Sequence, residues 1–376
     1  MRFCRACAAC MKPDSPLYLH GLWGYPAPDE VLPSPAQGWS FLSGFAIRPL
    51  GKEPAPSARY LLDKLLGSLP PQAFSAAPGA VYIGTARGEI TPLLSLYDTW
   101  KVSPTEALRP FPETTAGALS TLVAERLSCT GPALTLSQTC ISGIAALYQA
   151  YLYAAATKEP ACFGAVEAPL HPLLIESFAH LRLYTRRKTF PFTLPFSENS
   201  VVLSEGVVLG FISPAHSPWQ IERIALRISR GEGTTFTGLP EAAFSALLRS
   251  LSETPPQAVI LHAPGTRKGD ATELTAVEAV WGRLPALTLK PLIGHSVGAS
   301  GLLSLLWAQW LLSQQVWLYN TETLRVSPPD WPTFPAHEPE GLVRHLRLET
   351  PLRRIAILGA GFGGGVAGVI LQYAPL

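Results

Sequence analysis

Short apolar runs alternate with amphipathic segments through the first half of the chain. Apolar runs of four to eight residues indicate strands, and apolar residues recurring every three to four positions indicate helices. This pattern predicts strands at Leu17–Gly21, Ala80–Gly84, Ala133–Leu136 and Ala161–Glu167. It predicts helices at Ser57–Leu69, Thr114–Leu127 and Ile144–Ala156. Residues 168–200 look irregular, and Val201–Ile212 is expected to form a strand, a turn and a second strand that close this half.

The second half repeats the alternation. Strands are expected at Trp219–Ile228, Ala258–His262, Arg354–Leu358 and Val366–Tyr373. Helices are expected at Pro240–Leu251, Ala271–Trp281 and Val297–Leu312. Alternating strands and helices favour an α/β protein with mainly parallel sheets. The expected organisation is a tail at 1–16, a first half at 17–215 and a second half at 216–376.

Composition narrows the class of protein without deciding its function. The 376 residues carry a formal net charge of only +2, which gives no support for nucleic-acid binding. The best membrane-span candidate, Val297–Leu312, is short and contains Gln309, so we expect a core helix and no membrane segment. The first residues lack the apolar region of a signal peptide, and free thiols suit a reducing cytoplasm.

Three cysteines lie close together at the N-terminus. Cys4, Cys7 and Cys10 have a C-x-x-C-x-x-C spacing that suits no common zinc site, so no metal site is predicted. We interpret residues 1–10 as a misassigned start, with Met11 as the true first residue, or as a disordered extension.

Candidate chemistry begins at Cys140. It stands at the entrance of the apolar helix expected at Ile144–Ala156. The start of a helix presents unpaired N–H groups and the positive end of the helix dipole, so a thiol there is expected to ionise more easily. The alternative is a small buried residue without a reactive role.

Two histidines lie in similar places. His262 ends the strand expected at Ala258–His262 and precedes a loop of turn-forming residues, and His295 lies among glycines before an apolar helix. A lone histidine of this kind is more often a core residue than a catalyst. One thiol and two imidazoles, each at the end of an element, form a plausible set for acyl transfer and carbanion chemistry.

Four motifs in order resemble the β-ketoacyl synthases, which are condensing enzymes of the thiolase superfamily. Residues 139–143 (TCISG) are similar to T-A-C-x-S-G, and residues 262–273 are similar to an H-G-T-G-T loop followed by G-D-x-x-E. Residues 290–301 match K-x-x-x-G-H-x-x-G-A-x-G, and residues 361–364 match G-F-G-G. The resemblance implies a thiolase-like fold, with two similar halves in a five-layered αβαβα arrangement.

The resemblance also implies a role for each matching residue. Cys140 would hold the acyl group, and His262 and His295 would stabilise the enolate formed when a malonyl donor loses carbon dioxide. The backbone N–H groups of Cys140 and Phe362 would form an oxyanion hole, with Phe362 as a gate. Lys290 is expected to pair with Glu273. The remaining implied residues are Thr266, Gly363 and Gly364 for substrate binding, and Asp270 and Glu205 as supports.

The implied reaction is decarboxylative Claisen condensation by a stand-alone 3-oxoacyl-[acyl-carrier-protein] synthase, in fatty-acid, polyketide or aryl-polyene-type elongation. The implied partners are an acyl carrier protein, whose phosphopantetheine carries the substrate, and a second copy or a homologous subunit. No bound cofactor is implied. The basic residues Arg182, Arg186, Arg187 and Lys188 form either a solvated face or part of a carrier-protein surface.

Departures from the family pattern leave two alternatives open. Pro264 replaces a threonine that would contact pantetheine, and Gly365 and Val366 replace a Thr-Asn pair. These changes suggest altered acyl or carrier specificity. One alternative is therefore a non-catalytic partner of the chain-length-factor type, although such proteins lack the nucleophile. The other is a thiolase using coenzyme A, although residues 359–365 lack the cysteine that thiolases carry there.

Overall fold

The computed structural model describes residues 16–34, 36–70, 77–108, 110–229, 241–319, 324–326, 344–347 and 350–375. The tail predicted at 1–16, with Cys4, Cys7 and Cys10, lies almost wholly outside these residues. Within them, eleven strands form one continuous sheet. No helix among them is both long and apolar enough to cross a membrane.

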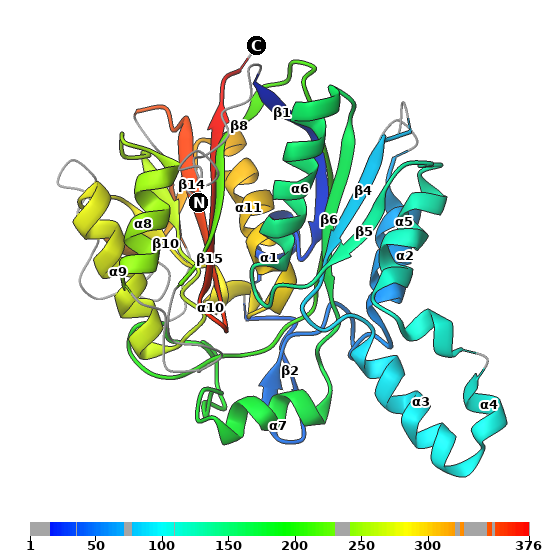
Figure 1. Ribbon diagram of the computed structural model, residues 1–376. Coiled ribbons are helices and arrows are strands. Elements are labelled where there is room, and N and C mark those ends of the chain that lie inside the picture. The colour runs from blue at the N-terminus through cyan, green and yellow to red at the C-terminus, as the bar shows by residue number, and fades with distance from the viewer. Residues whose placement is uncertain are drawn as a thin grey trace, which may run out of the picture.

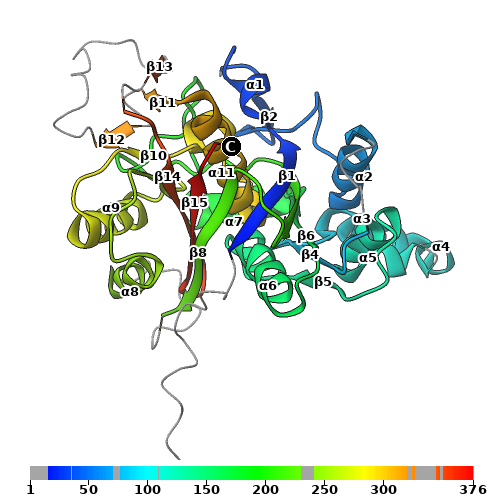
Figure 2. The same ribbon diagram turned by 90° about the horizontal axis from the view of Figure 1, so that it is seen from above.

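The sheet has two parts that meet at a short junction. One part contains β1 (Leu17–Tyr25), β7 (Gly206–Ser213), β6 (Ala161–Glu167), β4 (Ala80–Gly84) and β5 (Ala133–Leu136). The other contains β8 (Trp219–Ile228), β15 (Gly365–Tyr373), β14 (Arg354–Gly361), β9 (Ala258–Ile260), β10 (Ala286–Leu287) and β12 (Leu324–Val326). Antiparallel pairing of β1 with β8 joins them. From above, β1 and β8 lie at the centre, between β14 and β15 on one side and β4, β5 and β6 on the other (Figure 2).

Helices complete five layers, as Figure 1 shows. Between the two parts of the sheet lie α6 (Ser142–Thr157) and α11 (Ser300–Gln314), which are apolar on most sides because both faces of this layer are covered. The outer layers are α2 (Ala58–Ser68) with α5 (Gly117–Arg126), and α8 (Glu241–Leu251) with α9 (Arg267–Trp281). The predicted αβαβα arrangement is confirmed.

Glycine allows the two central helices to approach at their N-terminal ends. A Cβ at Gly143 would lie 2.8 Å from the carbonyl oxygen of Gly298, and one at Gly301 would lie 2.6 Å from Ile144. Because Cys140 and His295 each precede one of these helices, the close crossing brings the two residues together.

Several smaller elements surround this framework. The helices are α1 (Pro28–Val31), α3 (Ile90–Val102), α4 (Pro104–Leu108), α7 (Pro172–His180) and α10 (Lys290–Ile293), with 3₁₀ turns at η2 (Phe111–Thr114) and η3 (Val297–Ala299). Two strand pairs lie outside the large sheet: β2 (Ser40–Leu42) with β3 (Phe45–Ile47), and β11 (Val316–Tyr319) with β13 (Arg344–Arg347).

Three predictions about the fold were wrong. The sheet is mixed, because neighbours such as β14 and β15 are joined by a tight hairpin and must run antiparallel. Residues 168–200 are not wholly irregular, since they contain α7, which begins at Pro172 with His171 capping its start. The interval Val201–Ile212 holds one strand, β7, and its first residues instead make isolated bridges, such as Leu203 with His295.

Candidate active site

The turn before α6 presents Cys140 to a cavity. Thr139 has a φ of +50°, an unusual value for a β-branched residue, and such strain is often found at functional sites. The Ser142 hydroxyl holds the turn, because it donates to the Thr139 carbonyl at 2.6 Å and accepts from the Gln138 N–H at 2.8 Å. Gly361 of β14 lies against this turn, where a Cβ would collide with the Thr139 hydroxyl.

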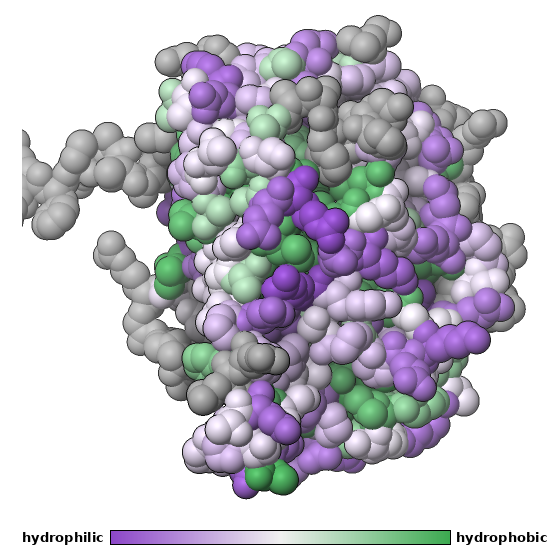
Figure 3. Space-filling model, turned by 90° about the vertical axis from the view of Figure 1, so that its right-hand side faces the viewer, coloured by the Kyte–Doolittle hydropathy of each residue, from purple (hydrophilic) through white to green (hydrophobic). Residues whose placement is uncertain are grey.

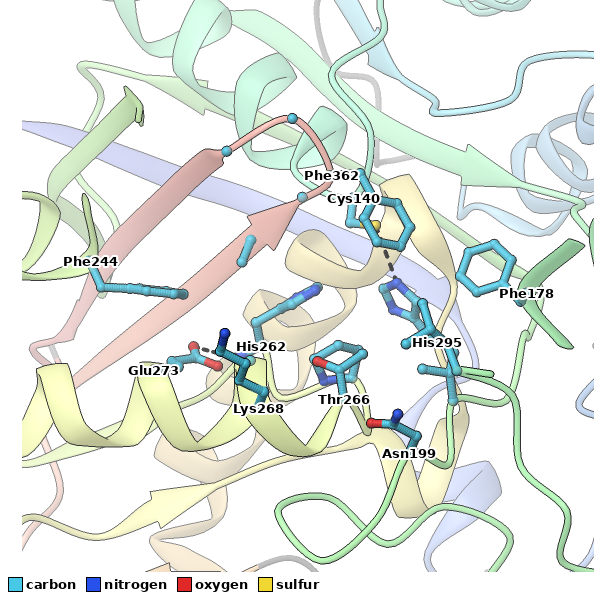
Figure 4. Close-up of a pocket in the computed structure, with 18 residues that line it drawn as sticks. Cys140, Phe178, Asn199, Phe244, His262, Thr266, Lys268, Glu273, His295 and Phe362 are labelled. Carbon is cyan, nitrogen blue, oxygen red and sulfur yellow. Dashed lines mark hydrogen bonds between the residues drawn. The ribbon is translucent and has the colours of Figure 1, made fainter. Parts of the chain in front are cut away.

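The three residues predicted to react lie together (Figure 4). Nε2 of His295 is 3.3 Å from Sγ of Cys140. The rings of His262 and His295 meet edge to face, with centroids 5.2 Å apart and an interplanar angle of 80°. One donor atom from each of the three residues lies within 4.8 Å of the others. All three side chains are buried, so the structure brings a thiol and two imidazoles into one dry site.

Buried carboxylates hold the loop that carries His262. The two carboxylate oxygens of Glu273 accept the backbone N–H groups of His262 and Ala263, each at 2.8 Å. Asp270 accepts the N–H of Thr266 at 3.1 Å and the N–H of Phe196 at 3.0 Å. Both acidic residues therefore position the histidine loop through its backbone.

Burial reverses the expected ionisation of the nucleophile. Desolvation, with a smaller contribution from the nearby Glu167, raises the pKa of the Cys140 thiol to about 12, although Lys290 and Arg87 act to lower it. The sequence-based expectation of an easily ionised thiol was therefore wrong, because burial outweighs the effect of the helix start. Burial also lowers the pKa values of His262 and His295 well below the ordinary value, and the positive charge of Lys290 lowers them further. Both imidazoles are consequently neutral at neutral pH.

Lys290 is fully buried but does not pair directly with Glu273. No ion pair joins the two among the described residues, and the Glu273 oxygens accept backbone N–H groups instead. Burial lowers the pKa of Lys290 to about 8, and the negative charge of Glu273 opposes that shift. Burial likewise raises the pKa of Glu273 to about 7. The predicted pairing is thus a longer-range attraction.

A cavity of about 310 Å³ opens onto the three reactive side chains. Thr266, Gly363 and Gly364, the residues expected to bind substrate, all line it, as do Pro264 and Phe362. Its other lining residues are Cys140, Phe178, Leu183, Asn199, Val201, Phe244, His262, Lys268, Gly269, Glu273, His295, Ala360 and Gly361.

Glu205 lies away from this cavity. Its carboxylate accepts the N–H groups of Leu50 at 2.8 Å and Ala55 at 2.5 Å, so it fastens the segment before α2 to the start of β7. The resemblance implied a supporting role for Glu205. Its contacts lie outside the cavity that holds the reactive residues.

Sequence reasoning missed several residues at the site. Ser300 contacts Nδ1 of His295 at 3.0 Å, and Phe178 of α7 packs against Phe362 with ring centroids 5.8 Å apart. Glu167 is buried at the end of β6, where its Oε1 accepts a hydrogen bond from the Thr85 hydroxyl at 3.2 Å. Ser300 occupies a variable position of its motif and carried no signal. Pro172 at the first position of α7 was a signal for that helix.

In the part of the chain that the structure describes, a metal would find three ligands together only at the reactive set. Among the described residues, Cys140, His262 and His295 form the one group of three whose donor atoms lie close enough to share an ion. A thiolate and two imidazoles are zinc ligands. An ion there would occupy the nucleophile, so a role as reactants fits these residues better.

Comparison with known protein families decides the relationship. The family description "Beta-ketoacyl synthase, N-terminal domain" matches residues 66–216, and "Beta-ketoacyl synthase, C-terminal domain" matches residues 244–323. Together the matches cover more than half of the chain, including Cys140, His262, Lys290 and His295. The chain belongs to the β-ketoacyl synthase family.

Individual relatives are distant. The β-ketoacyl synthase is 28% identical over 275 residues to a putative polyketide beta-ketoacyl synthase 1 from Streptomyces halstedii, covering 67% of the chain and 63% of the relative. It is 27% identical over 336 residues to the tetracenomycin polyketide synthase ketoacyl synthase alpha subunit from Streptomyces glaucescens, covering 81% and 76%. The match to an actinorhodin polyketide putative beta-ketoacyl synthase 1 from Streptomyces coelicolor covers 57% of that relative's length.

Solved structures share the fold at low identity. The ishigamide ketosynthase/chain length factor superposes with a TM-score of 0.74 at 17% identity, covering 96% of this chain and all of that one. A type II polyketide ketosynthase bound to a hexaketide and in complex with its acyl carrier protein gives a TM-score of 0.73 at 18% identity, with the same coverage. At these identities the likeness shows the fold alone.

Proposed function

We propose that this β-ketoacyl synthase catalyses decarboxylative Claisen condensation through Cys140, His262 and His295. The observation that carries the proposal is the contact of Cys140 Sγ with His295 Nε2 at 3.3 Å, beside the edge-to-face His262 ring and in the wall of one cavity. A chain that only shaped a partner's site would not need a thiol and two neutral imidazoles aimed at one point.

In the first half-reaction, the Cys140 sulfur attacks the thioester carbonyl of an acyl donor. A C–S bond to Cys140 forms, the C–S bond to the donor breaks, and the thiol proton is transferred to the leaving sulfur of the donor. Backbone N–H groups of Cys140 and Phe362 are the proposed oxyanion donors, and one such donor contributes about 3 kcal/mol in a dry site.

In the second half-reaction, a malonyl thioester enters the same cavity and loses carbon dioxide. The electrons of the broken C–C bond pass into an enolate, whose oxygen receives hydrogen bonds from the neutral His262 and His295 rings. The nucleophilic carbon then attacks the acyl-Cys140 carbonyl, which forms the new C–C bond and releases the Cys140 thiolate. That thiolate takes up a proton, and a β-ketoacyl thioester leaves.

Phosphopantetheine on an acyl carrier protein is the proposed carrier of both substrates. Thr266, Gly363 and Gly364 line the cavity and are the proposed contacts of the arm. Pro264 offers no hydroxyl there, which supports altered acyl or carrier specificity. By analogy with the carrier-protein complex and the ketosynthase/chain length factor structure described above, we propose a carrier protein and a second synthase subunit as partners.

Intact-mass spectrometry tests the first half-reaction. The purified protein is mixed with acyl-carrier-protein and acyl-coenzyme-A donors of several chain lengths. We expect one acyl group to be added to the wild type and to Cys129→Ala, a matched control that removes a half-buried thiol, but none to Cys140→Ala. No mass gain with any donor would instead favour the non-catalytic partner of the chain-length-factor type.

A further inference from the structure

Behind the ring of His295, on the side away from Cys140, lies a chain of two serine hydroxyls. Oγ of Ser300 is 3.0 Å from Nδ1 of His295, and Oγ of Ser296 is 3.3 Å from Oγ of Ser300. Both serines are buried, and neither lines the cavity. One unbroken line of contacts therefore runs from Ser296 through Ser300 and the imidazole to the Cys140 sulfur.

Local geometry explains why Ser300 reaches this ring. The 3₁₀ turn η3 (Val297–Ala299) separates His295 from α11, which begins at Ser300. Val297 has a φ of +40°, and this bend returns the chain beneath the imidazole. The first residue of α11 consequently faces Nδ1, whereas Ser304, one turn further along, is buried without a hydrogen bond to His295 among the described residues.

The two histidines are held in different ways. Glu273 holds His262 through backbone N–H groups, and among the described contacts neither ring nitrogen of His262 forms a hydrogen bond. His295 has both ring nitrogens engaged. The hydrogen bond made by one imidazole nitrogen decides which nitrogen carries the proton, so Ser300 can set the tautomer of His295 alone.

A neutral imidazole has one accepting nitrogen, and each ring nitrogen of His295 faces one possible donor: the Ser300 hydroxyl at Nδ1 or the Cys140 thiol at Nε2. Because a thiol is a weak donor, the arrangement in which the Ser300 O–H donates to Nδ1 is favoured. Ser296 can then donate to Ser300, because a hydroxyl accepts and donates at once. With Nδ1 accepting, the proton of the neutral ring must lie on Nε2, which points toward Cys140 and the cavity.

We propose that Ser300 is a positioning residue that holds His295 in the tautomer protonated at Nε2, ready to donate to the oxygen of a bound thioester. The role in catalysis rests on the function proposed above, but the tautomer does not. Ser300 occupies a variable position of the histidine motif, so the motif itself does not require this hydrogen bond to His295.

Nitrogen-15 NMR of histidine-labelled free protein tests the tautomer directly. The His295 signals are assigned among the eight histidines as those absent from His295→Gln. We expect an unprotonated Nδ1 and a protonated Nε2 in the wild type, a mixture of tautomers in Ser300→Ala, and the wild-type pattern in Ser300→Thr and Ser304→Ala. A protonated Nδ1 in the wild type, or an unchanged pattern in Ser300→Ala, would overturn the proposal.

Kinetics with malonyl and acyl carrier thioesters test the consequence. Losing one neutral hydrogen bond corresponds to about a tenfold lower kcat for condensation in Ser300→Ala. The KM for the malonyl donor and the extent of Cys140 acylation should stay unchanged, Ser300→Thr should restore most of kcat, and Ser304→Ala should resemble the wild type. A tautomer shift without a fall in kcat rejects the positioning role, whereas absence of acylation in every form rejects the proposed function and leaves the tautomer assignment standing.

Discussion

At the scale of single residues, opposing effects act on Cys140. The start of α6 and the charges of Lys290 and Arg87 favour the thiolate, whereas burial and Glu167 favour the thiol. Burial prevails, because the thiol is enclosed by both central helices and the β14–β15 hairpin. The proposed nucleophile is therefore held as an uncharged thiol beside a neutral imidazole.

The pH dependence of Cys140 alkylation should show that the thiol is uncharged at neutral pH. A thiol whose pKa is raised to about 12 gains thiolate about tenfold per pH unit throughout the range from pH 7 to 9.5. We expect the rate of iodoacetamide labelling, followed by peptide-resolved mass spectrometry, to rise across that whole range. A short cysteine peptide with both ends blocked, whose thiol has the ordinary pKa of about 8.5, serves as the reference and levels off. Levelling of the Cys140 rate near pH 7 or 8 would show that the helix start prevails over burial.

At the scale of elements, the hairpin of β14 and β15 and the helix α7 together form one wall of the cavity. Gly361, Gly363 and Gly364 surround Phe362, and the two later glycines have φ values of +89° and +79°, which favour glycine. This turn places Phe362 beside Cys140, where its ring packs against Phe178 of α7 at 5.8 Å and 49°. Phe362, the proposed gate, thus rests on a buried aromatic partner.

Removing the Phe178 ring should broaden the range of acyl groups that the cavity accepts. Phe178→Ala deletes a buried ring that lines the cavity, so we expect longer or bulkier acyl groups to be loaded onto Cys140 than in the wild type. The cost should be about 3 kcal/mol of unfolding free energy. Intact-mass measurement over a series of acyl donors gives the selectivity, and denaturant unfolding gives the stability. Leu173→Ala, at a half-exposed position of the same helix, is the control. Unchanged chain-length preference would place the acyl group elsewhere.

An element can be predicted from the sequence when enough of its apolar residues are buried in the core to leave a regular pattern. The bounds of β4 and β8 were predicted residue for residue, because both strands have clear apolar or alternating patterns. The helix α3 was missed because none of its residues is buried, so it has no core-facing stripe. Cys140, His262 and His295 were found from motif spacing. Phe178 contacts Phe362, which is distant in the sequence, and Ser300 reaches His295 through the bend at Val297, so motif spacing revealed neither residue.

At the scale of the whole molecule, α3 and α4 stand out from the five layers (Figure 1). Apolar side chains are exposed there: Val102 is 88% exposed, Tyr97 55%, Trp100 52% and Leu93 40%. The side of the molecule nearest these helices shows several hydrophobic patches between hydrophilic side chains (Figure 3). Exposed apolar groups gathered on one projection are typical of a surface that another subunit covers.

This projection should therefore contribute to subunit association, in keeping with the second copy or homologous subunit that the family resemblance implies. The rings of Tyr97 and Trp100 stack with centroids 6.1 Å apart, and the ammonium of Lys101 lies 4.2 Å from the centre of the Tyr97 ring. Charges placed on this pair would be buried without partners in a dimer, so Tyr97→Glu with Trp100→Glu should convert a dimer to a monomer in sedimentation velocity at micromolar concentration. Ile228→Glu, at an exposed apolar position of β8, should leave the dimer intact. A monomeric wild type, or a double variant that still sediments as a dimer, would exclude α3 as the contact.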